Sequence, residues 1–182
     1  MTRSGSYHHG DLRRALLDAA AEAMAESGVA ELSLRDLARR AGVSHAAPAH
    51  HFGDKAGLLT ALATEGYQLL GEALREGDDG LLEAGVAYVR FAVRHPAHFE
   101  VMFRPDLHRA DDQDLAAARA RTRELLRGGV AQHTGRDPDV DSLAAWSIVH
   151  GFATLWLSGA LPPRLGTDPE AAARTVIRRL FS

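Results

Sequence analysis

The side chains best suited to chemistry in this sequence lie close together, between residues 35 and 55. This stretch holds four arginine or lysine residues, two aspartates and three histidines. Arginine, lysine and serine side chains bind phosphate oxygens, and a histidine ring carries both a donor and an acceptor that can meet base edges. These residue types therefore favour contact with a nucleic acid over catalysis.

The sequence lacks the motifs of an enzyme. We find no nucleophile elbow, phosphate-binding loop, HExxH motif or pair of carboxylates at catalytic spacing. His95 and His98 bracket Pro96 at an interval that suits a metal ion, but no third ligand is evident nearby. The absence of cysteine excludes disulfides, thiol redox sensing and cysteine-bound zinc. We therefore expect no catalytic residue, no metal site and no cofactor.

Local signals around residues 33–42 predict a short helix and a tight turn. Ser33 and Asp36 have the spacing of a capping box, which starts a helix that continues to about Ala41. Gly42 then stands where the end of a helix needs a residue that tolerates a positive φ. The chain is therefore expected to turn sharply after this helix.

Two further capping residues predict the helices that follow. Ser44 is expected to cap a second short helix over residues 45–52, and Asp54 a third that begins near Lys55. Pro48 has no backbone donor, which removes about one bond from the first turn. Two short helices across a glycine turn form a helix-turn-helix, whose second helix can lie in the major groove of DNA.

This segment resembles the DNA-binding domain of the TetR family of one-component transcriptional regulators. The usual pattern of that family is a capped helix, Ala-Gly-Val-Ser, a recognition helix that ends in His-Phe, then Lys and a Leu-Leu pair. Family members usually carry an aromatic residue where this chain has Ala49, so one contact with DNA is missing here. The matching residues are Leu37-Ala38, Ala41-Gly42-Val43-Ser44, His51-Phe52, Lys55 and Leu58-Leu59.

The resemblance implies which side chains meet DNA. The histidines of the recognition helix supply polar contacts with base edges, whereas its alanines offer apolar contact, for instance with thymine methyl groups. Ala49 leaves more of this work to His50 or to the polar arm of residues 1–10. We expect His45, Ala46, Ala47 and His50 to face base edges, and Arg35, Ser44, His51 and Lys55 to hold phosphates.

Length and composition permit one domain, or two that pack closely together. The chain has 182 residues, of which 46% are hydrophobic, and a formal net charge of −3. We predict an all-α fold of about nine helices, with a three-helix helix-turn-helix domain (1–57) and a ligand-binding and dimerisation domain (58–182). The first residues lack the apolar core of a signal peptide, which favours a cytoplasmic protein. The other expected helices cover residues 11–27, 58–76, 81–94, 97–103, 115–133, 143–161 and 168–181.

Several aromatic residues in the second part of the chain are candidates for a ligand pocket. Plain core packing explains each aromatic residue about equally well, and His150 is more simply a core histidine with a satisfied hydrogen bond. The arginines of residues 115–133 are expected to pair with nearby acids rather than with DNA. The candidate pocket residues are Phe91, Phe99, Met102, Phe103, Trp146 and His150.

One helix is apolar on all sides. Residues 143–161 carry no charge and approach the length of a membrane span, but polar residues and glycines interrupt them, so we expect no membrane insertion. A helix that is apolar all round must be buried all round, so one face meets its own core and the other a second copy. The sequence leaves open which face is which: Trp146, Val149, His150, Ala153 and Leu157, or Ala145, Ile148, Phe152, Leu155 and Gly159.

The segment from Trp146 to Gly151 resembles the Trp-x-x-x-His-Gly signature of one TetR subgroup. The resemblance implies a homodimeric repressor that binds a palindromic double-stranded operator and is released by an apolar or amphipathic small molecule. A helical adaptor that no longer reads DNA and a metal-responsive regulator stay open as alternatives. TetR-like proteins dimerise through their last two helices, so the expected interface is Ala145, Ile148, Phe152, Leu155, Gly159, Val176 and Leu180.

Overall fold

The computed structural model describes residues 9–76, 80–134 and 137–179. Within these ranges the chain forms nine α-helices, two short 3-10 helices and no strand, so the predicted all-α fold is confirmed. Residues 1–8 of the polar arm and the expected interface residue Leu180 lie outside the described ranges. The helices are α1 His9–Glu31, α2 Leu34–Arg40, α3 Ala47–Phe52, α4 Lys55–Glu76, α5 Leu81–Arg94, α6 Pro96–Met102, η1 Pro105–Leu107, α7 Gln113–Thr134, α8 Pro138–Leu157, η2 Pro163–Leu165 and α9 Pro169–Arg178.

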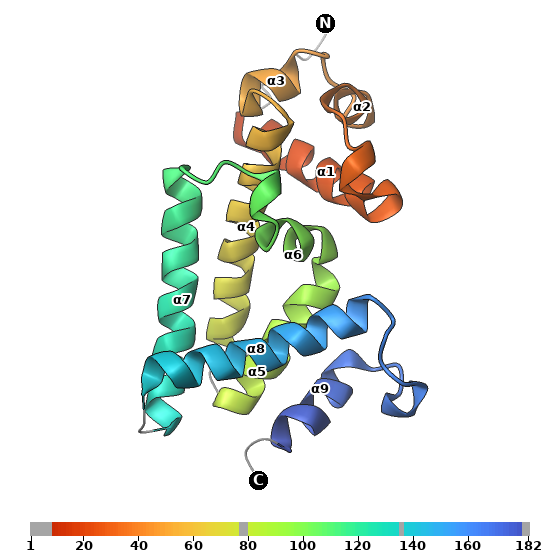
Figure 1. The fold of residues 1–182 in the computed structure, drawn as a ribbon. Helices are drawn as coiled ribbons and strands as arrows, with labels where there is room; N and C mark the ends of the chain where they lie inside the picture. The colour runs from red at the N-terminus through yellow and green to blue at the C-terminus, as the bar shows by residue number, and fades with distance from the viewer. Residues whose placement is uncertain (1–8, 77–79, 135–136, 180–182) are drawn as a thin grey trace, which may run out of the picture.

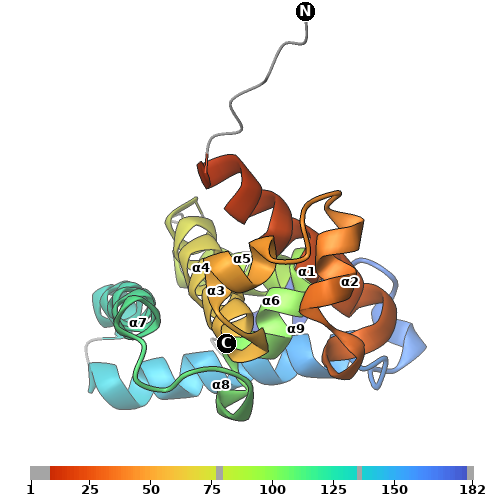
Figure 2. The ribbon, with the colours of Figure 1, turned by 90° about the horizontal axis from the view of Figure 1, so that it is seen from above.

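The first three helices form a small head at one end of the molecule (Figure 1). α4 begins in this head and runs down through the body, with α7 alongside it. α5 packs against α4, α8 and α9 in the body, while α6 lies between the body and α1. Seen from the head, α7 stands on the outer side of α4 (Figure 2). The border expected at residues 57/58 therefore falls inside one continuous helix.

A continuous apolar core joins the head to the body. Leu16 of α1, Leu37 of α2 and Phe52 of α3 are buried in the head. α4 continues this core because its buried residues, among them Leu58 and Leu62, recur on one face of the helix. Gly66 allows α6 to approach α4 closely, since a Cβ there would meet the side chain of Met102 on α6.

α3 begins later than the sequence predicts. The N-cap is Ala46, and no side chain caps the helix, so the expected capping role of Ser44 is wrong. A start at Ala47 places Pro48 in the first turn, where its missing donor removes no intrahelical bond. The preceding turn is closed by the backbone bond from Ala47 N to Ser44 O, at 3.0 Å.

The apolar helix α8 is displaced toward the N-terminus relative to its predicted position. The Asp137 side chain caps it, and Pro138 occupies the first helical position, a strong start signal that overrides the later loss of charged residues. Gly159, with φ 69°, ends the helix in a left-handed conformation. No helix in the described ranges is both long and apolar enough to cross a membrane.

Candidate nucleic-acid interface and ligand cavities

α2 uses its charged residues largely within the head. Ser33 Oγ accepts a hydrogen bond from Asp36 N at 3.2 Å, as the capping motif predicts. The Asp36 carboxylate accepts hydrogen bonds from Arg40 Nε at 2.7 Å and Arg39 Nη2 at 2.6 Å. These bonds, that from Arg40 first, lower the pKa of the Asp36 carboxyl. Arg40 also binds Glu26 of α1 at 2.7 Å, which ties α2 to α1.

Arg35 differs from the other two arginines of α2. Its side chain is exposed, and no hydrogen bond or ion pair joins it to another residue in the described part of the chain. Its charge is therefore available to a phosphate, and its contact with one stays a prediction.

The residues before and along α3 that are candidates for DNA contact are mostly on the surface of the head. His45, Ala46, Ala49 and His50 are exposed, and Ala47 is half-buried. Ser44 is exposed as well, without a capping role. These residues lie in the turn before α3 and along that helix, so one short segment presents all of them together.

His51 lies apart from this exposed set. It is half-buried, with its ring centroid 6.1 Å from that of Phe52. It lines a small cleft together with Arg13 of α1 and Arg109, which precedes α7. The geometry places His51 at the back of the recognition helix, between the head and the body.

Lys55 has a partner inside the protein. Its Nζ donates a hydrogen bond to the carbonyl oxygen of Ala30 at 3.0 Å. Ala30 lies in the last turn of α1, where carbonyl groups lack partners within the helix. Lys55 therefore holds the end of α1 against the start of α4, a structural role that the sequence did not reveal.

A contact from the body reaches the junction of α3 and α4. Asp54 Oδ1 accepts a bond from Gly57 N at 2.8 Å and thereby caps α4, as the sequence predicts. The same oxygen lies 3.0 Å from Arg109 Nη2, and Arg109 N donates to Thr60 Oγ1 at 2.9 Å. The Gly57 bond and then Arg109 lower the pKa of the Asp54 carboxyl. Arg109 was missed in the sequence because its partner lies more than fifty positions away.

A second contact joins α6 to the head. His98 Nε2 lies 3.0 Å from Glu65 Oε2 of α4, and Glu65 Oε1 lies 3.9 Å from Arg14 Nε of α1. The hydrogen bond with His98 is the main cause that lowers the pKa of Glu65. The rings of His95 and His98 meet edge to face at 5.6 Å. The described residues contain no group of three or more His, Cys, Asp or Glu side chains arranged to hold a metal ion.

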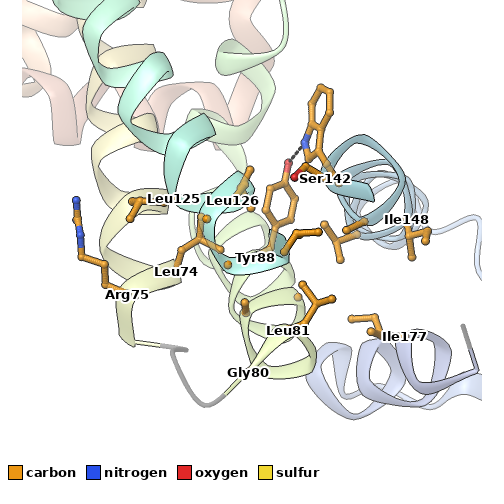
Figure 3. A pocket seen from close by; sticks show the side chains of 18 of the residues that line it. Leu74, Arg75, Gly80, Leu81, Tyr88, Leu125, Leu126, Ser142, Ile148 and Ile177 are labelled. Atoms are coloured by element: carbon orange, nitrogen blue, oxygen red, sulfur yellow. Dashed lines mark hydrogen bonds between the residues drawn. The ribbon is translucent and has the colours of Figure 1, made fainter. Parts of the chain in front are cut away.

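Two cavities lie in the body on either side of Tyr88 and Trp146. The α9 cavity, about 460 Å³, is bounded by α4, α5, α7, α8 and α9 (Figure 3). The α6 cavity, about 630 Å³, is bounded by α4, α5, α6, α7 and α8. Both volumes fall in the usual range for small-molecule sites, about 300–1,000 Å³. Four residues line both cavities, namely Tyr88, Leu126, Ser142 and Trp146.

A hydrogen-bond chain forms the wall between the two cavities. Trp146 Nε1 donates to Tyr88 Oη at 3.0 Å, the dashed line in Figure 3. Tyr88 Oη lies 3.1 Å from His150 Nδ1. Since tryptophan can only donate, the Tyr88 proton is left for His150, whose Nδ1 then accepts. Burial lowers the pKa of His150, which favours the neutral ring that this bond requires, and raises the pKa of Tyr88.

The six predicted pocket residues divide into two groups. Met102 and Phe103 line the α6 cavity, and Trp146 lines both cavities. Phe91, Phe99 and His150 line neither cavity in the described structure. His150 packs against Phe103 at 4.5 Å between ring centroids, and so supports the wall instead of facing a ligand. The sequence missed Tyr88 as a lining residue, although it stands on the same helix as Phe91.

The outward face of α8 combines parts of both faces predicted for it. Phe152 is buried in its own chain, stacked on Trp156 at 5.9 Å, whereas Ala145 and Ile148 line the α9 cavity. The large hydrophobic side chains most exposed among the described residues all belong to this helix: Val140, Leu143, Leu155 and Leu157. Of the remaining expected interface residues, Gly159 is exposed and Val176 is half-buried.

α9 is fixed to α5 and is therefore part of the core of its own chain. Arg90 of α5 binds both carboxylate oxygens of Glu170, at 2.8 and 2.7 Å. Arg174 binds Glu83 in the same way, at 3.1 and 2.7 Å. Bidentate pairs of this kind fix geometry as well as distance. Gly85 leaves space for Ile177 of α9, since a Cβ there would lie 2.9 Å from the Ile177 side chain.

The fold and these surfaces define a helix-turn-helix protein with a cavity-bearing helical body. Residues 16–62 match the family model for bacterial regulatory proteins of the tetR family, and residues 81–180 match that for the tetracyclin repressor-like C-terminal domain. The chain therefore belongs to the TetR family, and it is a transcriptional regulator of that family.

Individual proteins are similar to this chain over nearly its whole length. The chain is 31% identical to the HTH-type transcriptional repressor Rv1474c of Mycobacterium tuberculosis, covering 95% of this chain and 93% of that protein. A protein of unknown function from Rhodococcus sp. RHA1 is 34% identical, with a TM-score of 0.75 and coverage of 98% and 97%. The TetR-family regulator PfmR of Thermus thermophilus is 26% identical, with a TM-score of 0.66 and coverage of 90% and 97%.

Proposed function

We propose that this regulator is a homodimeric repressor that binds a palindromic operator through α3 and leaves it when a small molecule binds in the body. The observation that carries the proposal is the exposed segment from Ser44 to His50, supported on a buried three-helix core. A symmetric dimer presents two such segments to successive turns of DNA, about 34–36 Å apart or a multiple of that distance. His45 and His50 then read base edges, while Arg35 contacts a phosphate.

The outward face of α8 supports the dimer. Val140 and Leu143 are 61% and 58% exposed, and Leu155 is 47% exposed. At 100° per residue these side chains span roughly 120° of the helix circumference, and Gly151 lies within that arc, where a small residue permits close approach of a second helix. Exposed large apolar residues confined to one helix are typical of a protein–protein interface.

Single charge substitutions test this interface. Leu155→Arg is expected to give a monomer at micromolar concentration, because it would bury an unpaired charge between two copies. Ala120→Arg is a control, since Ala120 is exposed on α7, lies outside the proposed face of α8 and lines neither cavity. Sedimentation velocity distinguishes them, and a dimer that survives Leu155→Arg would contradict the proposed face.

Release from DNA requires that a ligand favour one spacing of the heads over another. The α6 cavity is joined to the head by a short path. Pro105 lines the cavity, and the same loop carries Arg109, which binds Asp54 and Thr60 at the start of α4. A ligand that moves this loop therefore changes the support of the recognition helix.

Arg109→Ala tests the path. The variant is expected to bind DNA and ligand, but to lose most of the coupling between them, which for such regulators is about 1–3 kcal/mol or roughly 5–150-fold in affinity. Arg104→Ala is the control, because the Arg104 side chain pairs with Asp106 of the same exposed loop and not with α4 in the described structure. Operator affinity with and without ligand, measured by fluorescence anisotropy, gives the coupling. Unchanged coupling between ligand and DNA in Arg109→Ala would show that the signal does not pass through Arg109.

The DNA-binding proposal is tested with the DNA upstream of the protein's own gene. His50→Ala is expected to change the preferred bases, whereas Arg35→Ala should weaken binding equally on all sequences. Selection from a random DNA library followed by sequencing measures both effects. The absence of any salt-sensitive, sequence-selective complex would contradict the proposed function, and would favour an adaptor that binds protein alone.

A further inference from the structure

We propose that the α6 cavity binds an amphipathic anion, whose negative group lies on Arg119 and Arg123 and whose apolar part lies against Phe103 and Trp146. The inference deepens the proposed function and rests on it in taking this cavity as the effector site. It follows from which polar groups of the cavity are already engaged and which are not.

Three arginines of α7 face this cavity. Arg119, Arg123 and Arg127 recur at every fourth position, which places them on one side of the helix, and all three line the cavity. The expectation that such arginines pair with nearby acids is met by Arg127, whose Nε lies 2.6 Å from Asp139 Oδ1. It is not met by the other two.

Arg119 and Arg123 carry positive charge and hydrogen-bond donors that no described residue neutralises or accepts. The Arg119 guanidinium lies over the Tyr67 ring at 5.5 Å, and its buried Nε has no hydrogen-bond partner among the described residues. Arg123 is exposed at the cavity and makes no hydrogen bond or ion pair with another described residue. A buried cationic donor without a partner is costly, and an acceptor on a ligand removes that cost.

The neutral polar groups of the cavity already have partners. Tyr67 Oη donates to the Met102 carbonyl at 3.2 Å, and Thr122 Oγ1 donates to the Tyr67 carbonyl at 2.9 Å. Trp146 Nε1 is bonded to Tyr88, and Ser142 Oγ to a backbone carbonyl of its own helix. The Asp139 carboxylate, the acid in the lining, binds Arg127. The polar capacity left for a ligand is therefore cationic and donating, which selects an acceptor with negative charge.

The rest of the lining is apolar and aromatic. Leu70, Met102, Phe103, Leu126 and Trp146 all contribute to it. Aromatic rings alone would also attract a cation, but a ligand cation beside Arg119 and Arg123 would be repelled. The arginines therefore select a ligand with a negative charge. The aromatic surface accepts any apolar chain of suitable size.

Ligands that differ only in head group test this. The chain has two tryptophans, so Trp156→Phe leaves Trp146 as a reporter in the cavity wall. Decanoate, decanol and decyltrimethylammonium are titrated below their micelle concentrations, with Trp146 fluorescence as the signal and calorimetry as the affinity. Decanoate is expected to bind about tenfold or more tightly than either other ligand, the size of one charge-assisted hydrogen bond.

Substitutions in α7 test whether Arg119 and Arg123 bind the negative group of the ligand. Arg119→Gln and Arg123→Gln are each expected to weaken decanoate binding about tenfold, without changing decanol binding. Arg121→Gln is the matched control, because Arg121 is exposed on the same helix but does not line the α6 cavity. Circular dichroism shows whether each variant keeps its helices.

The possible results separate this inference from the proposed function, because the titrations contain no DNA. Selective decanoate binding that depends on Arg119 and Arg123 supports the inference, whether or not an operator is found. Equal or tighter binding of decanol or decyltrimethylammonium overturns it, and so does decanoate binding that ignores both substitutions. A protein that binds an operator and is released only by cationic or neutral compounds keeps its repressor function and loses the inference.

Discussion

The head and the α6 cavity use their arginines in opposite ways. In α2 two of three arginines bind Asp36, and Arg40 also binds Glu26. In α7 one of the three arginines at the cavity binds an acid, and Arg119 and Arg123 do not. Positive charge in the head thus mainly fixes its own geometry, whereas positive charge in the cavity is left for a ligand.

This difference bears on how DNA is bound. Lys55 is bonded to Ala30, which adds to the cations that the head uses internally. Among the described residues Arg35 is the arginine of α2 without an internal partner, and the segment from Ser44 to His50 carries no arginine or lysine, so few cations of each head are left for phosphates. In the proposed dimer useful affinity depends on two heads acting together, so we expect the outward face of α8 to matter for DNA binding as well as for assembly.

The largest expected effect compares a buried ring in the head with one in the body. Phe52→Ala should lower the free energy of unfolding by about 3–5 kcal/mol and abolish operator binding, since Phe52 is 6% exposed and supports α3. Phe103→Ala should cost less, because Phe103 is half-buried beside a cavity, and should leave DNA binding intact. Chemical denaturation and a mobility shift measure both. Equal losses would remove the contrast between head and cavity.

The next effect concerns the wall between the cavities. Tyr88→Phe leaves Trp146 Nε1 and His150 Nδ1 without their partner and should cost about 1–3 kcal/mol. Tyr67→Phe removes one hydroxyl bonded to a single carbonyl and should cost about 1 kcal/mol. Urea unfolding of the two variants gives the comparison. A smaller loss for Tyr88→Phe than for Tyr67→Phe would show that the chain of bonds adds no stability.

Acidification should weaken the body through three histidines that are half-buried or buried. The pKa of His95, His108 and His150 is lowered from 6.5 by burial, so the native state binds fewer protons than the unfolded chain. Their contribution is complete above pH 6.5 and is lost as pH falls below it. Melting temperatures between pH 7.5 and 5.5 measure this. His150→Gln should flatten the dependence, and an unchanged slope would argue against a neutral His150.

The smallest effect on stability is expected at the DNA surface. Arg35→Ala should leave the free energy of unfolding unchanged. It should reduce the slope of log operator affinity against log salt concentration by about one. Lys55→Ala should instead lower the free energy of unfolding by about 1 kcal/mol, because the hydrogen bond to Ala30 is lost. It should reduce the salt slope of operator affinity less than Arg35→Ala does. Equal reductions in slope would place Lys55 on a phosphate despite its internal bond.

Much of the head could be predicted because its signals are local. Ser33, Gly42 and Asp54 each act on backbone groups within about three residues, and the structure has the cap, the positive φ and the second cap where expected. The error at Ser44 is also local, since Pro48 moved the start of α3. Which exposed residues of α3 touch DNA stays a prediction.

The body was less predictable because its important contacts join distant residues. No spacing in the sequence brings Arg109 to Asp54, or Tyr88 to Trp146 and His150. The regular spacing of Arg119, Arg123 and Arg127 was visible, but whether an acid or a cavity faces them depends on how α7 packs against α4 and α8.

The amino-acid sequence by itself determined the helices, the helix-turn-helix and the family, since caps, glycine turns and apolar spacing act over a few residues. Only the tertiary structure decided which sides of α8 are buried, because a helix that is apolar all round has no period to orient it. It also decided which arginines remain without partners. Burial and pairing are properties of the packed chain, and they select the surfaces left for DNA, ligand and a second subunit.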